Sequence, residues 1–213
     1  MFVISDVHGD VSKIYRLLKN KPLHDKHVIL LGDIGYGFPG FDAYSLSRLF
    51  VYMSTVNFYV VQGNHDNADA MICNDSNVQM ITTYTGAKVH YINNKAVLLV
   101  PGALSYDKNM RVPNVSWWVN EQMQENQLAD VIDLGLQVDL ILSHDAPLQQ
   151  YLSFYPETKT SMTNRALDTL LFTLIREQKD ITWVHGHLHF NYLERKNGVT
   201  LCGVGEDGYL ILE

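Results

Sequence analysis

Cysteine is scarce in this sequence: among 213 residues there are two, Cys73 and Cys202, and they form no C-x-x-C pair. Two cysteines cannot build a disulfide framework, and their spacing does not match that of a structural zinc site. We therefore expect both side chains to lie in the interior as small apolar groups. With 46% hydrophobic residues, the chain has enough apolar material for a sizeable core without covalent cross-links.

Long apolar runs and an excess of basic residues are also missing. No stretch of about 18 apolar residues occurs, so no membrane span is expected. The N-terminal residues MFVISDVHGD turn polar after four positions, too early for a secretory signal. With 16 Lys and Arg against 23 Asp and Glu, the net charge of -7 does not favour an extended nucleic-acid surface, which needs clustered cations. These absences predict a soluble, cytoplasmic protein.

Linkers, internal repeats and low-complexity segments are missing as well, so we expect one domain spanning residues 1–213. In the first third, the apolar runs FVIS, HVILLGD and FYVVQGN alternate with helical spacing over residues 10–19 and 42–53. This β-α-β-α-β order predicts parallel strands joined by right-handed crossovers. Continuously apolar runs are expected where both faces of a sheet are covered.

The remainder of the chain contains more strands than a single doubly wound sheet requires. Asn197-Gly198 predicts a hairpin turn, and the strand-like runs are VQMIT, KVHYI, KAVLLVPG, VDLILSHD, ITWVHGHLHF, YLER, VTLCGV and YLIL. Helices are expected near 120–134 and 163–177, with Thr163 as the N-cap of the second. The predicted fold class is therefore α/β, with two stacked mixed sheets flanked by helices.

Side chains with catalytic potential gather where the predicted strands end. FVISDVH, VILLGD, YVVQGNHD, LILSHD and ITWVHGHLH each finish on aspartate, asparagine or histidine. The residues are Asp6, His8, Asp33, Asn64, His65, Asp66, His144, Asp145, His187 and His189. Because ligands bind at the carboxyl edge of the strands in α/β sheets, we expect these side chains to share one site.

Each motif has an ordinary structural explanation when it is taken alone. DVHGD is typical of a polar turn before a helix, GNHD is typical of an Asx turn, and strand histidines are often only hydrogen-bonded. No structural requirement, however, places a nitrogen or oxygen ligand at the end of every strand. Taken together, the imidazoles, carboxylates and amide favour two ions of Mn, Fe, Zn or Ni, with one carboxylate bridging them.

The five motifs also resemble those of a known family. In order along the chain, DVH, GD, GNHD, SHD and GHLH are similar to the D-x-H, G-D, G-N-H-[DE], isolated H and G-H-x-H blocks of the calcineurin-like metallophosphoesterases. The resemblance extends from Asp6 to His189 and implies a four-layer αββα sandwich. It also implies hydrolysis of phosphate esters by a hydroxide that bridges two divalent ions, for which Mn is preferred.

The resemblance further implies roles for individual residues. The seven implied metal ligands are Asp6, His8 and His189 for one ion, Asn64, His144 and His187 for the other, and Asp33 as the bridge. His65 would face the substrate, stabilise phosphoryl oxygens and protonate the leaving group. Asp66 would orient His65 or cap a helix, and Asp145 would support a metal-binding histidine or serve only in a turn. His185 lies outside the G-H-x-H block, so a packing or supporting role is expected.

Phosphate recognition departs from the pattern of the protein Ser/Thr phosphatases in this superfamily. Their G-D-x-x-D-R-G block is replaced by GDIGYGFPG, which contains no arginine. The stretch SYDKNMRVPNVSWW resembles a segment of small superfamily members found in bacteria and phages, and it offers Arg111 as the replacement. Arg111 would clamp phosphate or be a solvated loop charge. One tryptophan of the pair Trp117-Trp118, for which we take Trp117, would wall the pocket or stack on a base, or the pair would pack in the core. Tyr36 and Phe38 would line the entrance, and Asn64 would also contact substrate.

Two classes of function are compatible with these residues. The first is a metal-dependent phosphatase or phosphodiesterase acting on a small phosphate ester, with the monoester and diester branches both open. The second is a catalytically silent metal-binding scaffold that mediates protein contacts, although such a scaffold is expected to lose ligands that this chain retains. His24, His27 and His90 lie away from the motifs and are assigned no role.

Overall fold

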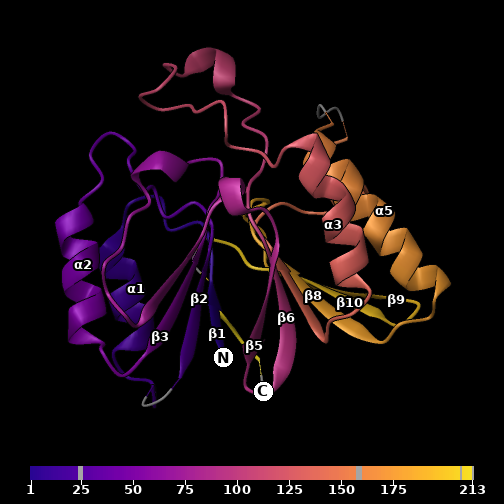
Figure 1. Cartoon of the computed structure of the whole chain (residues 1–213), viewed down its shortest axis with the longest axis horizontal. Coiled ribbons are helices and arrows are strands. Elements are labelled where there is room, and N and C mark those ends of the chain that lie inside the picture. Colours follow the sequence, from indigo (N-terminus) through magenta and orange to yellow (C-terminus); the bar gives the residue numbers. More distant parts are fainter. Residues whose placement is uncertain (24–25, 157–159, 207, 213) are drawn as a thin grey trace.

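The computed structural model describes residues 1–23, 26–156, 160–206 and 208–212. His24 lies outside the described residues. The described chain forms two mixed β-sheets that pack face to face, with helices on both outer faces (Figure 1). This αββα layering confirms the fold class that the strand count and the family resemblance predict.

The first sheet has the strand order β11-β1-β2-β3-β4, with β1 to β4 parallel and β11 antiparallel to β1. Its strands are β1 (Phe2–Ile4), β2 (His27–Leu31), β3 (Asn57–Val61), β4 (Val78–Ile81) and β11 (Leu210–Ile211). Helices α1 (Val11–Leu18) and α2 (Ala43–Tyr52) cover its outer face. Asp10 and Asp42 begin these helices, because each side chain accepts a hydrogen bond from an N–H of the first turn.

The second sheet has the order β5-β6-β7-β8-β10-β9, in which β6, β7, β8 and β10 run parallel. Its strands are β5 (Lys88–Ile92), β6 (Lys95–Val100), β7 (Leu140–Ser143), β8 (Ile181–His185), β9 (Tyr192–Lys196) and β10 (Val199–Gly203). Helices α3 (Glu125–Gly135) and α5 (Met162–Arg176) cover its outer face (Figure 1). The predicted Asn197-Gly198 turn joins β9 to β10, with φ values of 45° and 97°.

The apolar strands bury both of their faces because each sheet is covered on both sides. In β2, Val28 and Leu30 pack toward α1 and α2, whereas Ile29 and Leu31 pack between the two sheets. Cys202 also lies in the core between the sheets, while Cys73 is half-buried against the helix-side core of the first sheet. Both thiols are free, and the sulfur of Cys73 also accepts the N–H of Asp75 at 3.4 Å.

Two helices begin at residues other than those predicted, and one further helix was not predicted. Helix α3 begins at Glu125 rather than 120, because Gln124 and Gln127 form a reciprocal capping box there. Helix α5 begins at Met162 with Ser161 as its N-cap, so Thr163 is not the cap. Helix α4 (Leu148–Phe154) was not predicted, since seven residues give too short a periodic pattern to separate from a loop.

The carboxyl ends of the parallel strands gather at one edge of the molecule, at the top of Figure 1. The segment 101–124 extends over this edge, and the N-terminus lies at the opposite edge (Figure 1). None of the helices in the described ranges has both the length and the apolar content needed to cross a membrane. The edge under segment 101–124 is where the polar strand-end residues meet.

Candidate metal centre

The polar residues at the strand ends form two groups of donor atoms that share one aspartate. The first group is Asp6, His8, Asp33 and His189, and the second is Asp33, His144 and His187. Within each group the donor atoms lie within 4.8 Å of one another. Asn64 joins the second group, because its Oδ1 atom is 3.3 Å from Nε2 of His144.

Distances within the first group show how closely these side chains converge. Nε2 of His8 is 3.2 Å from Nε2 of His189, which is in turn 3.4 Å from Oδ1 of Asp6. Oδ2 of Asp33 lies 4.0 Å from Nε2 of His8, and Oδ1 of Asp33 lies 3.3 Å from Nε2 of His144. The two oxygens of Asp33 therefore face different groups, which is the arrangement that a bridging carboxylate requires.

Two of the imidazoles are held in one tautomer by partners on the far side of the ring. Nδ1 of His144 lies 2.9 Å from the carbonyl oxygen of Leu31, and Nδ1 of His189 lies 2.6 Å from a carboxylate oxygen of Glu206. Each Nδ1–H is thereby used, so each Nε2 is left to face the centre. Imidazole nitrogens, carboxylates and an amide oxygen in this arrangement are consistent with a site for two metal ions.

The charges of the second group are strongly coupled. Burial alone would raise the pKa of Asp33, yet the imidazoles of His144, His65 and His8 hold it well below its usual value. Burial opposes protonation of His144, but Asp33 and Asp6 raise the pKa of His144 to about 10. Burial, reinforced by His144, lowers the pKa of His187 to about 3. A buried carboxylate thus retains its charge where cations would bind.

The backbone is strained at five of these positions. All five have a φ in the left-handed region, with values of 54°, 48°, 51°, 63° and 59° for Asp6, His8, Asp33, His187 and His189. A non-glycine residue in this conformation costs about 1 kcal/mol or more. Strain concentrated on the donor residues indicates that these positions are shaped for a ligand, because an unstrained loop would stabilise the fold better.

Two glycines allow the strand ends to approach one another. A Cβ atom added at Gly63 would lie 2.2 Å from Oδ1 of Asp33. A Cβ atom at Gly186 would lie 1.9 Å from Oγ of Ser5 and 2.8 Å from Oδ2 of Asp6. No side chain fits at either position without displacing an aspartate of the site.

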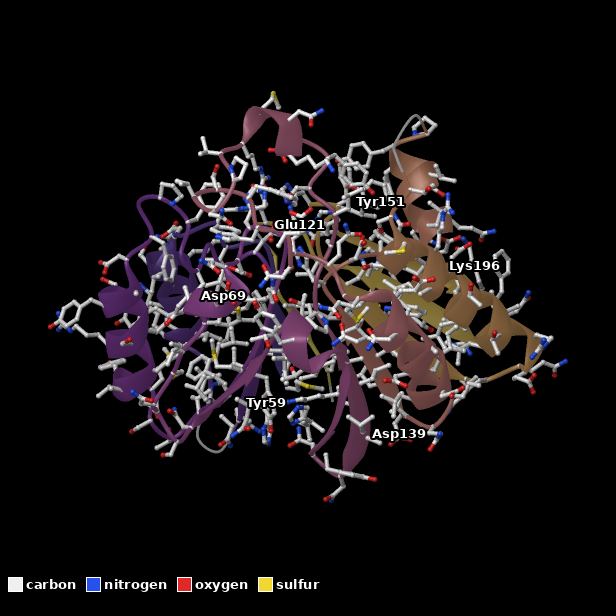
Figure 2. All side chains as sticks on the ribbon, turned by 45° about the horizontal axis from the view of Figure 1, so that its top comes forward. Tyr59, Asp69, Glu121, Asp139, Tyr151 and Lys196 are labelled. Atoms are coloured by element: carbon white, nitrogen blue, oxygen red, sulfur yellow. The ribbon has the colours of Figure 1, made fainter. Side chains whose placement is uncertain are left out.

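A buried hydrogen-bond chain fixes the orientation of Asn64. The Nδ2 group of Asn64 donates to Oγ of Ser105 at 3.1 Å, and the Ser105 hydroxyl donates to Oε2 of Glu121 at 2.5 Å. All three side chains are at most 3% exposed. Because the amide nitrogen faces Ser105, the amide oxygen faces His144 and the second group. Figure 2 shows Glu121 on the loop-bearing edge, with Tyr151 of α4 nearby.

His65 and Arg111 lie side by side next to Asp33. The N–H of His65 donates to Oδ1 of Asp33 at 2.8 Å, and the guanidinium of Arg111 contacts Nε2 of His65. Arg111 also pairs with Asp107 at 2.8 Å, and its side chain is 7% exposed, so it is not a solvated loop charge. Burial lowers the pKa of His65, and Arg111 lowers it further against the opposite effect of Asp33.

Asp66 contacts neither of the partners considered from the sequence. Its carboxylate accepts hydrogen bonds from the backbone N–H groups of Ile34, Gly35, Tyr36 and Gly63. The 3-10 helix that follows is capped by Asn67 instead. Asp66 therefore anchors the glycine-rich loop that follows Asp33.

Other predicted site residues are placed as follows. Phe38 stacks on His65 with ring centroids 5.3 Å apart, whereas Tyr36 points away, donating its hydroxyl to the carbonyl of Ile72. Trp117 is half-buried beneath the ammonium of Lys108, and the neighbouring Trp118 is the tryptophan that contacts Phe38. Tyr36 thus serves packing, whereas the proposed contact of Trp117 with substrate stays a prediction.

Four further residues, Asp145, His185, His27 and His90, lie outside the two donor groups. Asp145 is buried, accepts an N–H from Ala146, and has its pKa raised by burial to about 7. His185 ends β8 inside the core, where Nε2 contacts the hydroxyl of Tyr192, and it belongs to neither donor group. His27 and His90 both pack on Tyr59, which Figure 2 shows far from Glu121.

Sequence reasoning missed four residues: Ser105, Glu206 and Tyr151, which contact donor side chains, and Glu121, which contacts Ser105. Ser105 and Glu206 follow β6 and β10, so the rule that identified the other strand-end residues would have found them. Glu121 and Tyr151 carry no such signal, because a loop glutamate and a tyrosine on a short helix are common features. Tyr151 contacts Nε2 of His187 at 3.4 Å, and its place depends on tertiary folding alone.

Comparison with known families agrees with this geometry. The calcineurin-like phosphoesterase model matches residues 1–191. The chain belongs to this family. The matched residues include both donor groups, His65 and Arg111. Membership of the family implies phosphate esters as the class of substrate. No curated protein matches the sequence at a significant level.

Solved structures with this fold include two phosphoesterases. One is phosphopantetheinyl hydrolase from Mycobacterium tuberculosis, with 15% identity, a TM-score of 0.54, and coverage of 97% of this chain and 89% of that one. The other is a dimetal phosphatase from Danio rerio, with 14% identity, a TM-score of 0.51, and coverage of 96% and 86%. At these identities the likeness establishes the fold and leaves the substrate to be argued from the site.

Proposed function

We propose that this chain is a dinuclear metal-dependent phosphoesterase that hydrolyses phosphate monoesters or small phosphodiesters. The observation that carries the proposal is Asp33, whose two carboxylate oxygens face two separate groups of ligands while His65 and Arg111 lie beside it. Family membership supports phosphate esters as substrates. A scaffold would need neither the strained donor residues nor a buried arginine next to them.

In this proposal seven side chains hold the two ions. They are Asp6, His8 and His189 for the first, Asn64, His144 and His187 for the second, and Asp33 for both. The mixed nitrogen and oxygen donors favour Mn, with Fe, Zn and Ni as alternatives, over Ca. When bound, the ions lower the pKa of water to supply a nucleophile and neutralise charge on the phosphoryl oxygens.

Arg111 and His65 are assigned to the phosphoryl group and the leaving group. Arg111 offers a planar set of N–H donors that matches two phosphate oxygens, and Asp107 holds it in position. In the structure Arg111 contacts Nε2 of His65, which favours the neutral imidazole. A phosphate bound to Arg111 would offset this positive charge, so the pKa of His65 would rise and the imidazole could protonate the leaving oxygen.

The test compares p-nitrophenyl phosphate with bis(p-nitrophenyl) phosphate, using purified protein with Mn²⁺. We expect hydrolysis of at least one ester and a loss on the order of 100-fold in kcat/KM for Arg111→Gln. Arg48→Gln is the matched control, because Arg48 lies on α2 over Tyr44. Absence of turnover with Mn²⁺, Fe²⁺, Zn²⁺ and Ni²⁺ would refute the proposed function, and a strong preference would decide between monoester and diester.

A further inference from the structure

A cavity of about 360 Å³ opens beside His8 and His65. Its lining comes from His8 and Gly9 after β1, from residues within 35–41 after β2, and from His65. The first donor group is the more exposed of the two, through His8 and His189, so the cavity borders the accessible side of the centre. A substrate whose phosphoryl group lay on the ions could therefore extend into it.

The lining is aromatic and without formal charge. Phe38 and Phe41 form its walls together with Pro39, and none of the described lining residues carries a carboxylate, ammonium or guanidinium group. Among the described lining residues, the polar side chains are the imidazoles of His8 and His65 next to the donor groups, so a hydroxyl placed against the phenyl rings would have no side-chain partner there. A flat uncharged ring would stack on them instead.

The aromatic wall is held in place from behind. Asp66 accepts the N–H groups of Gly35 and Tyr36, and the N–H of Asn67 donates to the carbonyl of Tyr36 at 2.7 Å. The ring of Tyr36 packs against Phe41 with centroids 5.1 Å apart. A wall that is ordered before the ligand arrives adds less conformational entropy cost to binding. Asp66 and Tyr36 therefore serve to hold the cavity wall, a role separate from the phosphoryl chemistry.

Size limits the group that the cavity can hold. Ligand sites commonly occupy about 300–1,000 Å³, so this cavity lies near the lower end of the range. A volume of this size accommodates a single ring system. We infer that the substrate of the proposed phosphoesterase carries one flat, uncharged ring, an aryl group or a nucleobase, which binds against the cavity wall formed by Phe41 and by the part of Phe38 that is not stacked on His65. This inference rests on the proposed function.

The experiment measures binding of two non-hydrolysable phosphonates to the Mn²⁺-loaded protein by titration calorimetry. Benzylphosphonate and cyclohexylmethylphosphonate share the charged group and differ in whether the ring is flat or puckered. We expect benzylphosphonate to bind about tenfold tighter or more, because stacking on aromatic side chains has this magnitude. The nucleobase is tested by hydrolysis, because adenosine 5′-monophosphate and ribose 5-phosphate are both hydrolysable monoesters: a similar ratio of their kcat/KM values identifies the nucleobase as the ring, and equal values identify an aryl group.

Variants of the two phenylalanines test whether the preference for the flat ring arises in the cavity. Phe38→Leu and, separately, Phe41→Leu keep the lining apolar but remove a flat face, and we expect each to bring the affinity ratio toward one. Phe172→Leu is the control, because Phe172 is 50% exposed on α5, outside the cavity lining. Equal affinity for the two phosphonates in the wild type, or an unchanged ratio in both cavity variants, would overturn the inference.

Hydrolysis of the p-nitrophenyl esters by the same preparation separates this inference from the proposed function. Hydrolysis without a preference for the flat ring would refute the aromatic cavity and leave the phosphoesterase in place. A preference that depends on Phe38, found without hydrolysis of any ester, would retain the cavity as a binding site for ring-bearing phosphates and refute the catalytic proposal.

Discussion

Ser105→Ala removes the link between Asn64 and Glu121. The serine hydroxyl accepts from Nδ2 of Asn64 at 3.1 Å and donates to Glu121 at 2.5 Å, inside a region where these side chains are at most 3% exposed. Its loss leaves a buried amide and a buried carboxylate each short of one partner, at about 1–3 kcal/mol apiece. We expect the free energy of unfolding of the metal-free protein to fall by about 2–6 kcal/mol.

The same substitution should weaken one metal ion selectively. Residues that orient a ligand typically contribute about 10- to 100-fold to metal affinity, or about 1.4–2.7 kcal/mol. Calorimetric titration with Mn²⁺ should therefore show one of two binding events weakened by this factor and the other nearly unchanged. Ser116→Ala is the matched control, because Ser116 lies in the same segment and its hydroxyl accepts the N–H of Val112. Equal weakening of both events, or of neither, would refute the proposed role of Ser105.

Three further predictions concern packing and pH. Gly186→Ala should destabilise the metal-free protein by about 1–3 kcal/mol in urea unfolding, because its Cβ would lie 1.9 Å from Oγ of Ser5; unchanged stability would contradict the crowding. Asp66→Asn should speed amide hydrogen exchange at Gly35 and Tyr36, whose N–H groups the carboxylate accepts, and unchanged exchange would contradict the anchoring role. Burial lowers the pKa of His185 from 6.5 to about 4, so its contribution to stability is present above pH 6.5 and is lost as the pH falls toward 4. We expect the His185 contribution to the free energy of unfolding to fall by about 2–3 kcal/mol between pH 7 and 4.5. Urea unfolding at the two pH values should show this decrease in the wild type and a decrease smaller by that amount in His185→Gln.

The layers of the fold and the meeting of the strand ends could be predicted from the sequence for a physical reason. Fully apolar strands such as β2 require cover on both faces, and parallel strands deliver their carboxyl ends to one edge. Asp6, Asp33 and His144 therefore had to lie near one another once the strands were identified correctly. The three histidines at alternate positions in VHGHLHF do not lie on one face of a strand. Strand β8 ends at His185, and His187 and His189 lie beyond it.

Other features depend on tertiary contacts that no local pattern encodes. Ser105 links Glu121 to Asn64 only because segment 101–124 folds over the strand ends. The Asp66 carboxylate likewise accepts backbone N–H groups of a neighbouring loop, which no local pattern indicates. Whether Tyr36 or Phe38 faced His65 depended on the turn geometry of a glycine-rich loop, in which Gly35 and Gly37 have φ values of 90° and 78°. Sequence alone identifies such residues as candidates, but it does not give the direction in which each side chain points.

The most direct test of the central claim is the rate of p-nitrophenyl ester hydrolysis measured against the number of Mn²⁺ ions bound per chain. Because Asp33 is shared by both donor groups, catalysis is expected to need both ions. We predict that turnover rises with the second equivalent of Mn²⁺ and that Asp33→Asn abolishes this rise. Full turnover with one ion per chain, or no turnover with two, would contradict the dinuclear phosphoesterase.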